Sequence, residues 1–221
     1  SRVTYRLHLA GEPQVVAGFE TVLKVVAHLI RGETVTLTYD NQVEALAGVA
    51  TAHRAGRRCV VCFMGDPNFS GYQLLARVEN AGEGRVELVP GISSAQIVAS
   101  LERLPFDEAA FVSFHKRGDL GRDREHLLAA LRAGRPAMVL PRPWDFMPDA
   151  IARFLVSNGL PPETAVTVYE RLTIDDAAWG GTLAELGGGA PGREWSDMSI
   201  LVVRAAGETK GQAGPPRGGA R

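Results

Sequence analysis

Two short segments of the sequence combine turn residues with polar groups that could hold a ligand. Residues 65–67 (Gly-Asp-Pro) follow an apolar run at 59–64, and residues 90–94 (Pro-Gly-Ile-Ser-Ser) follow an apolar run at 86–89. The first segment offers a carboxylate, the second offers two hydroxyl groups, and both can expose backbone N–H groups. Each segment alone is better explained by ordinary structure than by ligand binding, because such residues commonly end strands or begin helices. Because ligands of open α/β sheets bind beyond the carboxyl ends of the strands, we interpret the two segments together as a candidate pocket.

A further group of candidate residues is basic. His115, Lys116 and Arg117 follow a predicted strand, and Arg142 lies in a turn between two prolines. Arginine forms bidentate contacts with carboxylates, so these side chains could bind an acidic substrate. They could also form a solvated loop, which is the more common role of such residues. From the residues alone, the sequence predicts a cleft for a polar, anionic ligand.

Other chemistries find little support in the sequence. Cys59 and Cys62 are the only cysteines, and both fall inside a predicted strand, whereas a redox pair needs a helix N-terminus. A zinc site would need further ligands at a suitable spacing, so we expect no metal. Glycine loops of the Rossmann or Walker type and a Ser/His/Asp pattern are not recognisable.

Apolar strand patterns alternate with amphipathic helix patterns along the chain. The expected strands are residues 15–18, 35–39, 59–64, 86–89, 109–114, 136–140, 165–169 and 198–204. The expected helices are residues 21–30, 41–54, 72–79, 94–103, 122–132 and 145–157. This alternation predicts an α/β fold with mostly parallel strand pairing. A break near residues 104–107 predicts two α/β domains, 1–106 and 107–206, followed by a disordered tail at 207–221.

The composition is that of an ordinary soluble globular protein. The chain has 221 residues, of which 45% are hydrophobic and 22% charged, and its net charge of -1 provides no overall basic field for nucleic acid. The sequence contains no apolar run long enough to span a bilayer and does not begin with a signal pattern. We therefore expect a cytoplasmic protein that binds neither nucleic acid nor membranes.

The order of three segments resembles the tetrapyrrole methylase family. These segments are GDPNFSG (65–71), VPGISSAQIVASLERLPFDEAAFVSFHKRG (89–118) and VYERLTIDDAAWGGTLAEL (168–186). Within the family, SFHKRG (113–118) and AGFETVL (17–23) are most similar to the members that methylate carbon 5 of a precorrin, or of cobalt-precorrin-7, in cobalamin biosynthesis.

The resemblance implies two α/β domains with S-adenosylmethionine, the methyl donor, in the cleft between them. It also implies a corrin precursor as the substrate, a homodimer, and a separate C15-methylating decarboxylase that acts on the same macrocycle. The residues that match the family's cofactor-binding turns are Met64, Gly65, Asp66, Phe69, Ser93, Ser94, Leu140 and Leu172. The residues expected to grip the carboxylates of the macrocycle are His115, Lys116, Arg117 and Arg142.

The sequence departs from the family at its start. Family members normally open with a strand and a G-x-G-P-G-D-like loop, which supplies an acidic catalytic residue in some of them. Here the sequence begins SRVTYRLHLAGEPQ, and Gly11-Glu12-Pro13 is a poor match to that loop. We therefore assign no catalytic acid or base, and we expect that the chain lacks its natural start or has diverged.

Two alternative functions follow from these observations. One is a methyltransferase of the same fold with another substrate, such as another precorrin, rRNA ribose or diphthine; an RNA substrate should be accompanied by a basic stripe, which the sequence does not show outside its tail. The other is a cofactor-binding module without turnover, which the atypical start favours.

Overall fold

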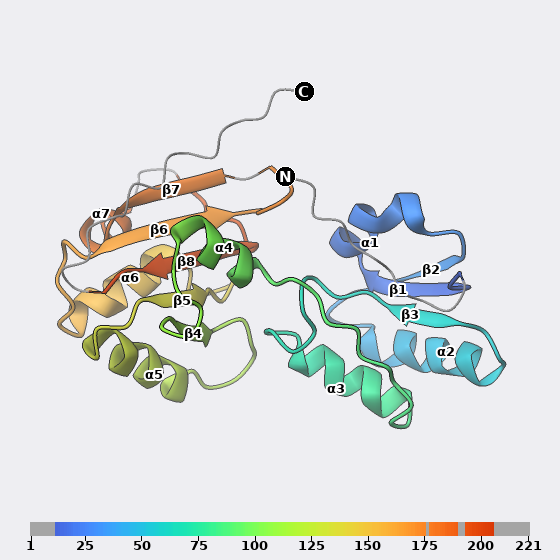
Figure 1. Cartoon of the computed structure of the whole chain (residues 1–221). Helices are drawn as coiled ribbons and strands as arrows, with labels where there is room; N and C mark the ends of the chain where they lie inside the picture. Colours follow the sequence, from blue (N-terminus) through green and yellow to red (C-terminus); the bar gives the residue numbers. More distant parts are fainter. Residues whose placement is uncertain (1–11, 176, 190–192, 206–221) are drawn as a thin grey trace, which may run out of the picture. The chain divides into compact units, whose positions relative to one another are not determined.

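The computed structural model describes residues 12–175, 177–189 and 193–205 (Figure 1). Predictions for the first eleven residues and for the tail at 207–221 lie outside the described residues. The chain divides into two compact units, Ser1–Ser93 and Ser94–Arg221, and each contains a β-sheet with helices packed on it. The predicted α/β class with two domains is therefore confirmed.

The first unit contains a three-stranded sheet in the order β2-β1-β3, with all strands parallel. The strands are β1 (Val15–Phe19), β2 (Glu33–Leu37) and β3 (Cys59–Val61). The helices are α1 (Glu20–Val26), which continues into the 3-10 turn η1 (Ala27–Leu29), α2 (Gln42–Arg54) and α3 (Tyr72–Ala81). Helix α1 lies on one face of the sheet, and α2 and α3 lie on the other (Figure 1). This two-sided cover explains why β1 is an almost uninterrupted apolar run.

The strand predicted at residues 86–89 is wrong. This segment is extended but pairs with no strand among the described residues, since β3 forms the edge of the described sheet. Leu88 and Val89 remain 39% and 47% exposed. An apolar run predicts the tendency to form a strand, but a strand also needs a neighbour to hydrogen-bond with.

The second unit contains a five-stranded sheet in the order β4-β5-β8-β6-β7. The strands are β4 (Ala110–Ser113), β5 (Ala137–Leu140), β6 (Ala165–Glu170), β7 (Ala177–Thr182) and β8 (Ser199–Val203). Only β4 and β5 pair in parallel; β8 runs antiparallel to both β5 and β6, and β7 is antiparallel to β6. The prediction of mostly parallel pairing is thus correct for the first unit and wrong for the second, because β8 inserts between two strands that precede it in the sequence.

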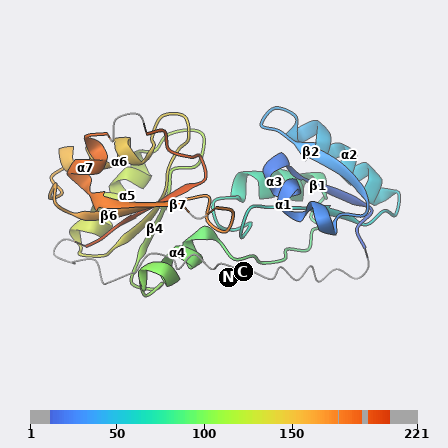
Figure 2. The same cartoon turned by 90° about the horizontal axis from the view of Figure 1, so that it is seen from above.

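Helices cover both faces of this second sheet. They are α4 (Ser94–Glu102), α5 (Gly121–Arg132), α6 (Pro148–Ser157) and α7 (Leu183–Gly187). Helix α4 lies on one face and the other three lie on the opposite face (Figure 2). The main hydrophobic core fills the space between that opposite face and α5, α6 and α7, with Leu127, Ile151 and Leu201 fully buried. None of the helices in the described ranges combines the length and apolar character needed to cross a membrane.

The observed division of the chain differs from the expected boundary near residue 106 in the placement of α4. The last residue of this helix, Glu102, accepts a hydrogen bond from the Tyr169 hydroxyl (2.7 Å) and forms an ion pair with Arg204. Both partners belong to the second unit, so α4 groups with the sheet that follows it.

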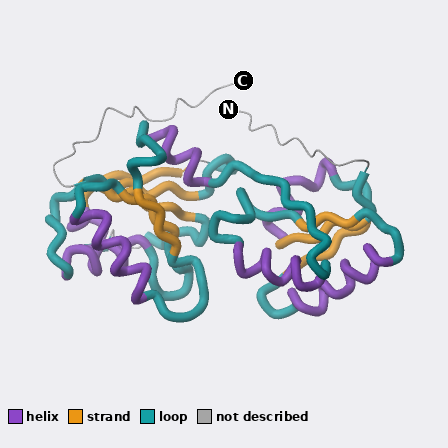
Figure 3. The backbone as a smooth tube through the Cα atoms, turned by 60° about the horizontal axis from the view of Figure 1, so that its bottom comes forward, coloured by secondary structure: helices purple, strands orange, loops and turns teal. Residues whose placement is uncertain are grey.

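Two elements were missed by the sequence reading, β7 and α7. The sequence of β7, AAWGGT, favours a strand only through Trp179 and Thr182, since its other residues are alanine and glycine, which are depleted in strands. Helix α7 has only five residues, but Thr182 and Glu185 form a capping box at its start, which is a readable signal. Figure 3 shows all the described helices and strands along the backbone, coloured by type.

Candidate functional site

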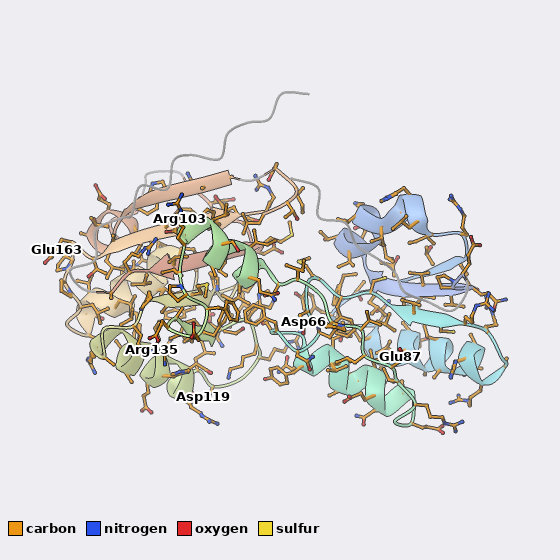
Figure 4. The ribbon with its side chains drawn as sticks, in the orientation of Figure 1. Asp66, Glu87, Arg103, Asp119, Arg135 and Glu163 are labelled. Carbon is orange, nitrogen blue, oxygen red and sulfur yellow. The ribbon has the colours of Figure 1, made fainter. Side chains whose placement is uncertain are left out.

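The two turns that the sequence singled out lie against each other in the first unit. Asp66, on the loop that follows β3 (Figure 4), accepts hydrogen bonds from the Asn68 amide at Oδ1 (2.8 Å) and from the Gly91 amide at Oδ2 (3.0 Å). A Cβ atom on Gly91 would lie 2.5 Å from the Gly65 carbonyl oxygen, and one on Gly65 would lie 3.2 Å from the Ser93 Cα. Glycine is therefore required at both positions for the two backbones to approach this closely.

The other predicted cofactor residues of these turns have different degrees of burial. Met64 is 58% exposed beside the contact between the turns, whereas Ser93 is buried. The Phe69 amide donates to the Asp66 carbonyl oxygen (2.9 Å), which closes the first turn, and Ser94 begins α4. The exposed thioether of Met64 leaves an adaptable apolar surface next to the turn backbone.

In the second unit, the carboxyl ends of β4, β5 and β6 lie at the same end of the sheet. Ser113 ends β4 opposite Leu140 at the end of β5, and Glu170 ends β6 opposite Ser199 at the start of β8. Because β8 is antiparallel to β5 and β6, its first residues lie beside the carboxyl ends of the other strands. The predicted site residues that follow these strands therefore gather at this end: His115, Lys116, Arg117, Arg142 and Leu172.

Leu172 lies in a strained turn. Its neighbours Arg171 and Thr173 have φ angles of 47° and 68°, in the left-handed region that side chains normally avoid. For a β-branched threonine this conformation is a true outlier, and such strain is concentrated at functional sites. The strand before the turn is fixed by Glu170, whose carboxylate binds Arg193 (2.6 Å) and the Ser196 amide (2.8 Å).

Three of the four predicted substrate-binding residues have partners within the second unit. Burial lowers the pKa of His115, although the Asp197 carboxylate and a hydrogen bond to the Pro141 backbone act in the opposite direction. Lys116 forms an ion pair with Asp123 (2.6 Å), with both side chains mostly buried.

Arg142 is bound to Asp145 through two nitrogens and to the Gly118 carbonyl through the third. Arg117, in contrast, is exposed and has no hydrogen bond or ion pair within the described ranges. Of these four residues, Arg117 is therefore the one whose charge remains available to an external carboxylate.

The sequence reading missed the acidic partners of these basic residues. Asp123, Asp145 and Asp197 each neutralise or face a basic side chain that follows a strand. Only Asp145 had a local signal, because it lies three residues after Arg142 in the same turn. The other two come from different segments, and nothing in their sequence context pointed to them.

Cys59 and Cys62 are half-buried and free, and burial raises the pKa of both thiols. This agrees with a packing role and not with a reactive thiolate. Among the described residues, no group of three His, Cys, Asp or Glu side chains is arranged to hold a metal ion.

A hollow of about 470 Å³ in the first unit contains none of the predicted site residues. It lies between β2 and α2, and its wall includes Val35, Gly48 and the exposed ion pair of Glu33 with Arg57. Its small side chains and self-paired charges offer no set of converging polar groups, so we do not take it as a candidate site. The candidate residues of the first unit are those of the two turns, and the candidate residues of the second unit are those at its strand ends.

Two comparisons of the sequence with known proteins give matches over most of the chain. The sequence model of the family described as Tetrapyrrole (Corrin/Porphyrin) Methylases matches residues 8–187. A probable cobalt-precorrin-7 C(5)-methyltransferase of Methanocaldococcus jannaschii is 25% identical over 170 residues, which cover 77% of each chain.

Two solved structures share the fold. The methyltransferase CobJ has a TM-score of 0.67 at 14% identity and covers 88% of this chain and 84% of its own. The uroporphyrin-III C-methyltransferase of Thermus thermophilus, in complex with S-adenosylhomocysteine, has a TM-score of 0.66 at 23% identity and covers 87% and 86%. Together with the family match over most of the chain, these findings establish that this protein is a methyltransferase that belongs to the tetrapyrrole (corrin/porphyrin) methylase family.

Proposed function

We propose that this protein transfers a methyl group from S-adenosylmethionine to carbon 5 of a corrin precursor, a precorrin or cobalt-precorrin, in cobalamin biosynthesis. The relative from M. jannaschii supports the choice of substrate and of carbon, and the product-bound T. thermophilus structure supports the methyl donor. In this protein, the observation that carries the proposal is the contact between the two glycine-containing turns through Asp66 and Gly91.

The residues present fit such a methyl donor. The backbones of the two turns lie so close together that a Cβ atom on Gly91 would collide with the Gly65 carbonyl oxygen. The exposed Met64 borders this contact.

The role of Asp66 is to shape the site. Both carboxylate oxygens are already bonded to backbone amides, so its negative charge holds the two turns together and retains lone pairs for a ligand. When bound, S-adenosylmethionine supplies an electrophilic methyl group. The protein contributes chiefly proximity and orientation, which can lower a barrier by roughly 7–11 kcal/mol in well-oriented systems.

On the substrate side, Arg117 is our candidate to bind a carboxylate of the macrocycle, because its charge is not neutralised within the described residues. Changing Arg117 to Ala should raise the KM for the substrate while leaving the affinity for S-adenosylmethionine unchanged, and an unchanged KM would reject this role. The cofactor roles of Ser93, Ser94, Leu140 and Leu172, the homodimer, the cytoplasmic location and the separate decarboxylating partner remain predictions.

The test of the proposed function begins with cofactor binding. Isothermal titration of the Asp66→Asn variant should show an affinity for S-adenosylmethionine about tenfold weaker, since a charge-assisted hydrogen bond between the turns is lost. Asp119→Asn is the matched control: Asp119 also accepts one backbone amide, from Gly121 (3.0 Å), but lies in a loop of the second unit (Figure 4). Equal affinities of the two variants would contradict the assignment of Asp66.

The reaction itself is tested by incubating the protein with S-adenosylmethionine labelled with ¹³C at its methyl group and with metal-free or cobalt-bearing precursors. A labelled methyl group at carbon 5 of the product supports the proposal. Labelling at another carbon, or of rRNA or diphthine precursors only, would replace it with another substrate. Cofactor binding without turnover of any of these would favour the non-catalytic module.

A further inference from the structure

Arg142 is the most completely bonded of the basic residues at the end of the second sheet. Its Nε and Nη2 atoms donate to the two oxygens of Asp145 (2.5 and 2.9 Å), and its Nη1 donates to the Gly118 carbonyl (3.0 Å). The side chain is only 13% exposed. Each of its three nitrogens thus has a partner within the second unit.

The contact with Asp145 is rigid as well as close. The backbones of Arg142 and Phe146 exchange two hydrogen bonds (3.1 Å each), which closes the turn that carries both charged residues. A bidentate pair between guanidinium and carboxylate is among the strongest side-chain contacts. Binding a substrate carboxylate through Arg142 would require this pair to break, so the geometry argues against the role that the sequence suggested for this residue.

The contact with Gly118 fixes the middle of a loop. Residues 115–120 run from Phe114, which is fully buried, to Leu120, which is 3% exposed, so packing holds the loop at both ends. Gly118 has a φ of 99°, and its carbonyl is held by a side chain that comes from the end of a different strand, β5. Because Gly118 directly follows Arg117, the hydrogen bond from Arg142 to the Gly118 carbonyl restrains the backbone next to Arg117.

We propose that Arg142 is a positioning residue, which, paired with Asp145, holds the loop at residues 115–120 in the conformation in which Arg117 binds a carboxylate of the substrate. This inference rests on the proposed function, because the acidic macrocycle is the ligand. It assigns Arg142 and Asp145 to the site as an interacting pair, with no direct contact between either residue and the substrate.

Asp145→Asn distinguishes positioning from direct binding. If Arg142 bound the substrate itself, removing its internal competitor would lower the KM for the precursor. If Arg142 positions the loop, both Asp145→Asn and Arg142→Gln should raise this KM by about tenfold, the loss expected for one charge-assisted contact, and leave the affinity for S-adenosylmethionine unchanged. The double variant should then be no worse than Arg142→Gln alone, since both changes remove the same interaction.

Hydrogen exchange measured by mass spectrometry gives a readout that does not depend on activity. In the 221-residue chain without substrate, amides at residues 116–121 should exchange faster in Arg142→Gln and in Asp145→Asn than in the wild type. The matched control is Arg153→Gln, because Arg153 likewise joins an aspartate of its own helix, Asp149 (2.6 Å), to a glycine carbonyl, Gly187 (3.0 Å). This control should leave exchange in the 116–121 loop and the KM unchanged.

The outcomes separate the two proposals. Unchanged exchange in the loop, or a lower KM of Asp145→Asn, would overturn the positioning role. Faster exchange in both variants, together with a wild-type protein that methylates none of the corrin precursors, would overturn the proposed function and, with it, the role of Arg117 toward that substrate. Arg142→Lys provides a further check in which the charge is kept and the bidentate geometry is lost; positioning predicts that it behaves like Arg142→Gln.

Discussion

Burial has a larger effect on the pKa of His115 than its hydrogen-bonding and charged neighbours do. Desolvation lowers the pKa of His115 below its ordinary value of 6.5, whereas Asp197 and the Pro141 backbone oppose this shift. The sequence grouped His115 with Lys116 and Arg117 as cationic ligands of an acidic substrate. In the structure, a neutral imidazole is favoured near pH 7, which makes His115 a hydrogen-bonding group and leaves ionic binding to Arg117.

The lowered pKa of His115 predicts a pH-dependent stability. In the window between the folded-state pKa and 6.5, the unfolded chain binds more protons, so the contribution of the neutral histidine is present above about 6.5 and is lost as the pH falls through this window. The stability advantage of the wild type over His115→Gln should therefore shrink between pH 7.5 and 5.5 in urea titrations. His126→Gln, at an exposed position of α5, is the control for loss of a histidine. A constant difference at all pH values would contradict the prediction.

Gly65 allows a second prediction at the residue scale. Its φ of +74° would cost a side chain about 1–2 kcal/mol, and its Cβ would crowd the Ser93 backbone at 3.2 Å. Gly65→Ala should lower the free energy of unfolding by at least this amount and weaken binding of S-adenosylmethionine. Gly56→Ala carries the same backbone penalty (φ +87°) with open space around the new Cβ, so it should lose stability and keep its affinity. Equal affinities of the two variants would argue against a role of the Gly65 turn in cofactor binding.

At the scale of the elements, a buried polar network ties α4 to the second sheet. Glu102, at the end of α4, accepts hydrogen bonds from the Tyr169 hydroxyl on β6 and from Arg204, which follows β8. Arg204 also donates to the Glu102 backbone carbonyl (3.0 Å). Burial, followed by the contact with Glu102, raises the pKa of Tyr169, so its hydroxyl stays protonated and donates.

The hydrogen bond from Tyr169 to Glu102 is predicted to contribute less to the free energy of unfolding than the ion pair of Glu102 with Arg204. Tyr169→Phe removes one hydrogen bond and should cost about 1 kcal/mol of unfolding free energy. Glu102→Gln leaves Arg204 buried without a counter-ion and should cost about 3–5 kcal/mol. Urea unfolding of both variants measures the difference, and a Glu102→Gln protein as stable as Tyr169→Phe would show that the ion pair does not anchor α4.

The sequence predicted most elements because their signals are local. The helix at 41–54 and the strand at 165–169 are each found within one residue at either end, as α2 and β6. The strand predicted at 86–89 had equally good local character and failed for want of a partner. Helix α6 begins only at Pro148, later than the predicted 145, because residues 142–146 form the turn that contains the Arg142 pair.

At the scale of the whole molecule, the two units differ in how much of their structure is buried. The core of the second unit includes fully buried residues from most of its strands and from three helices. In the first unit, a small described cluster consists of Val15, Ala17 and Val49 with a few partly buried neighbours, and further buried residues include Leu37 and Leu46. Strand β2 is exposed along most of its length. Local stability follows buried apolar contacts, so the units should open with different free energies.

Native-state hydrogen exchange on the 221-residue chain tests this difference. Amides of β5, β6 and β8 should exchange at least about tenfold more slowly than those of β1 and β2. Addition of S-adenosylmethionine should slow exchange in the turns around Asp66 and Gly91, because binding to the folded state stabilises it. Equal protection of the strands in both units would contradict the first expectation, and unchanged turns would contradict the second.

Local sequence patterns were enough to predict the α/β class, the positions of most helices, the two turns around Asp66 and Gly91, and the family to which the protein belongs. These follow from periodicity, turn chemistry and motif order, which are set by residues close together in the chain. The folded chain was needed to see that β8 lies antiparallel between β5 and β6, that residues 86–89 have no strand partner among the described residues, and that Arg142 is bound to Asp145 and Gly118. The direction of a strand depends on residues far apart in the chain, and so does the choice of partner for most buried or half-buried charged side chains. A local sequence pattern holds no information about which of the many possible partners will lie nearby in the folded protein.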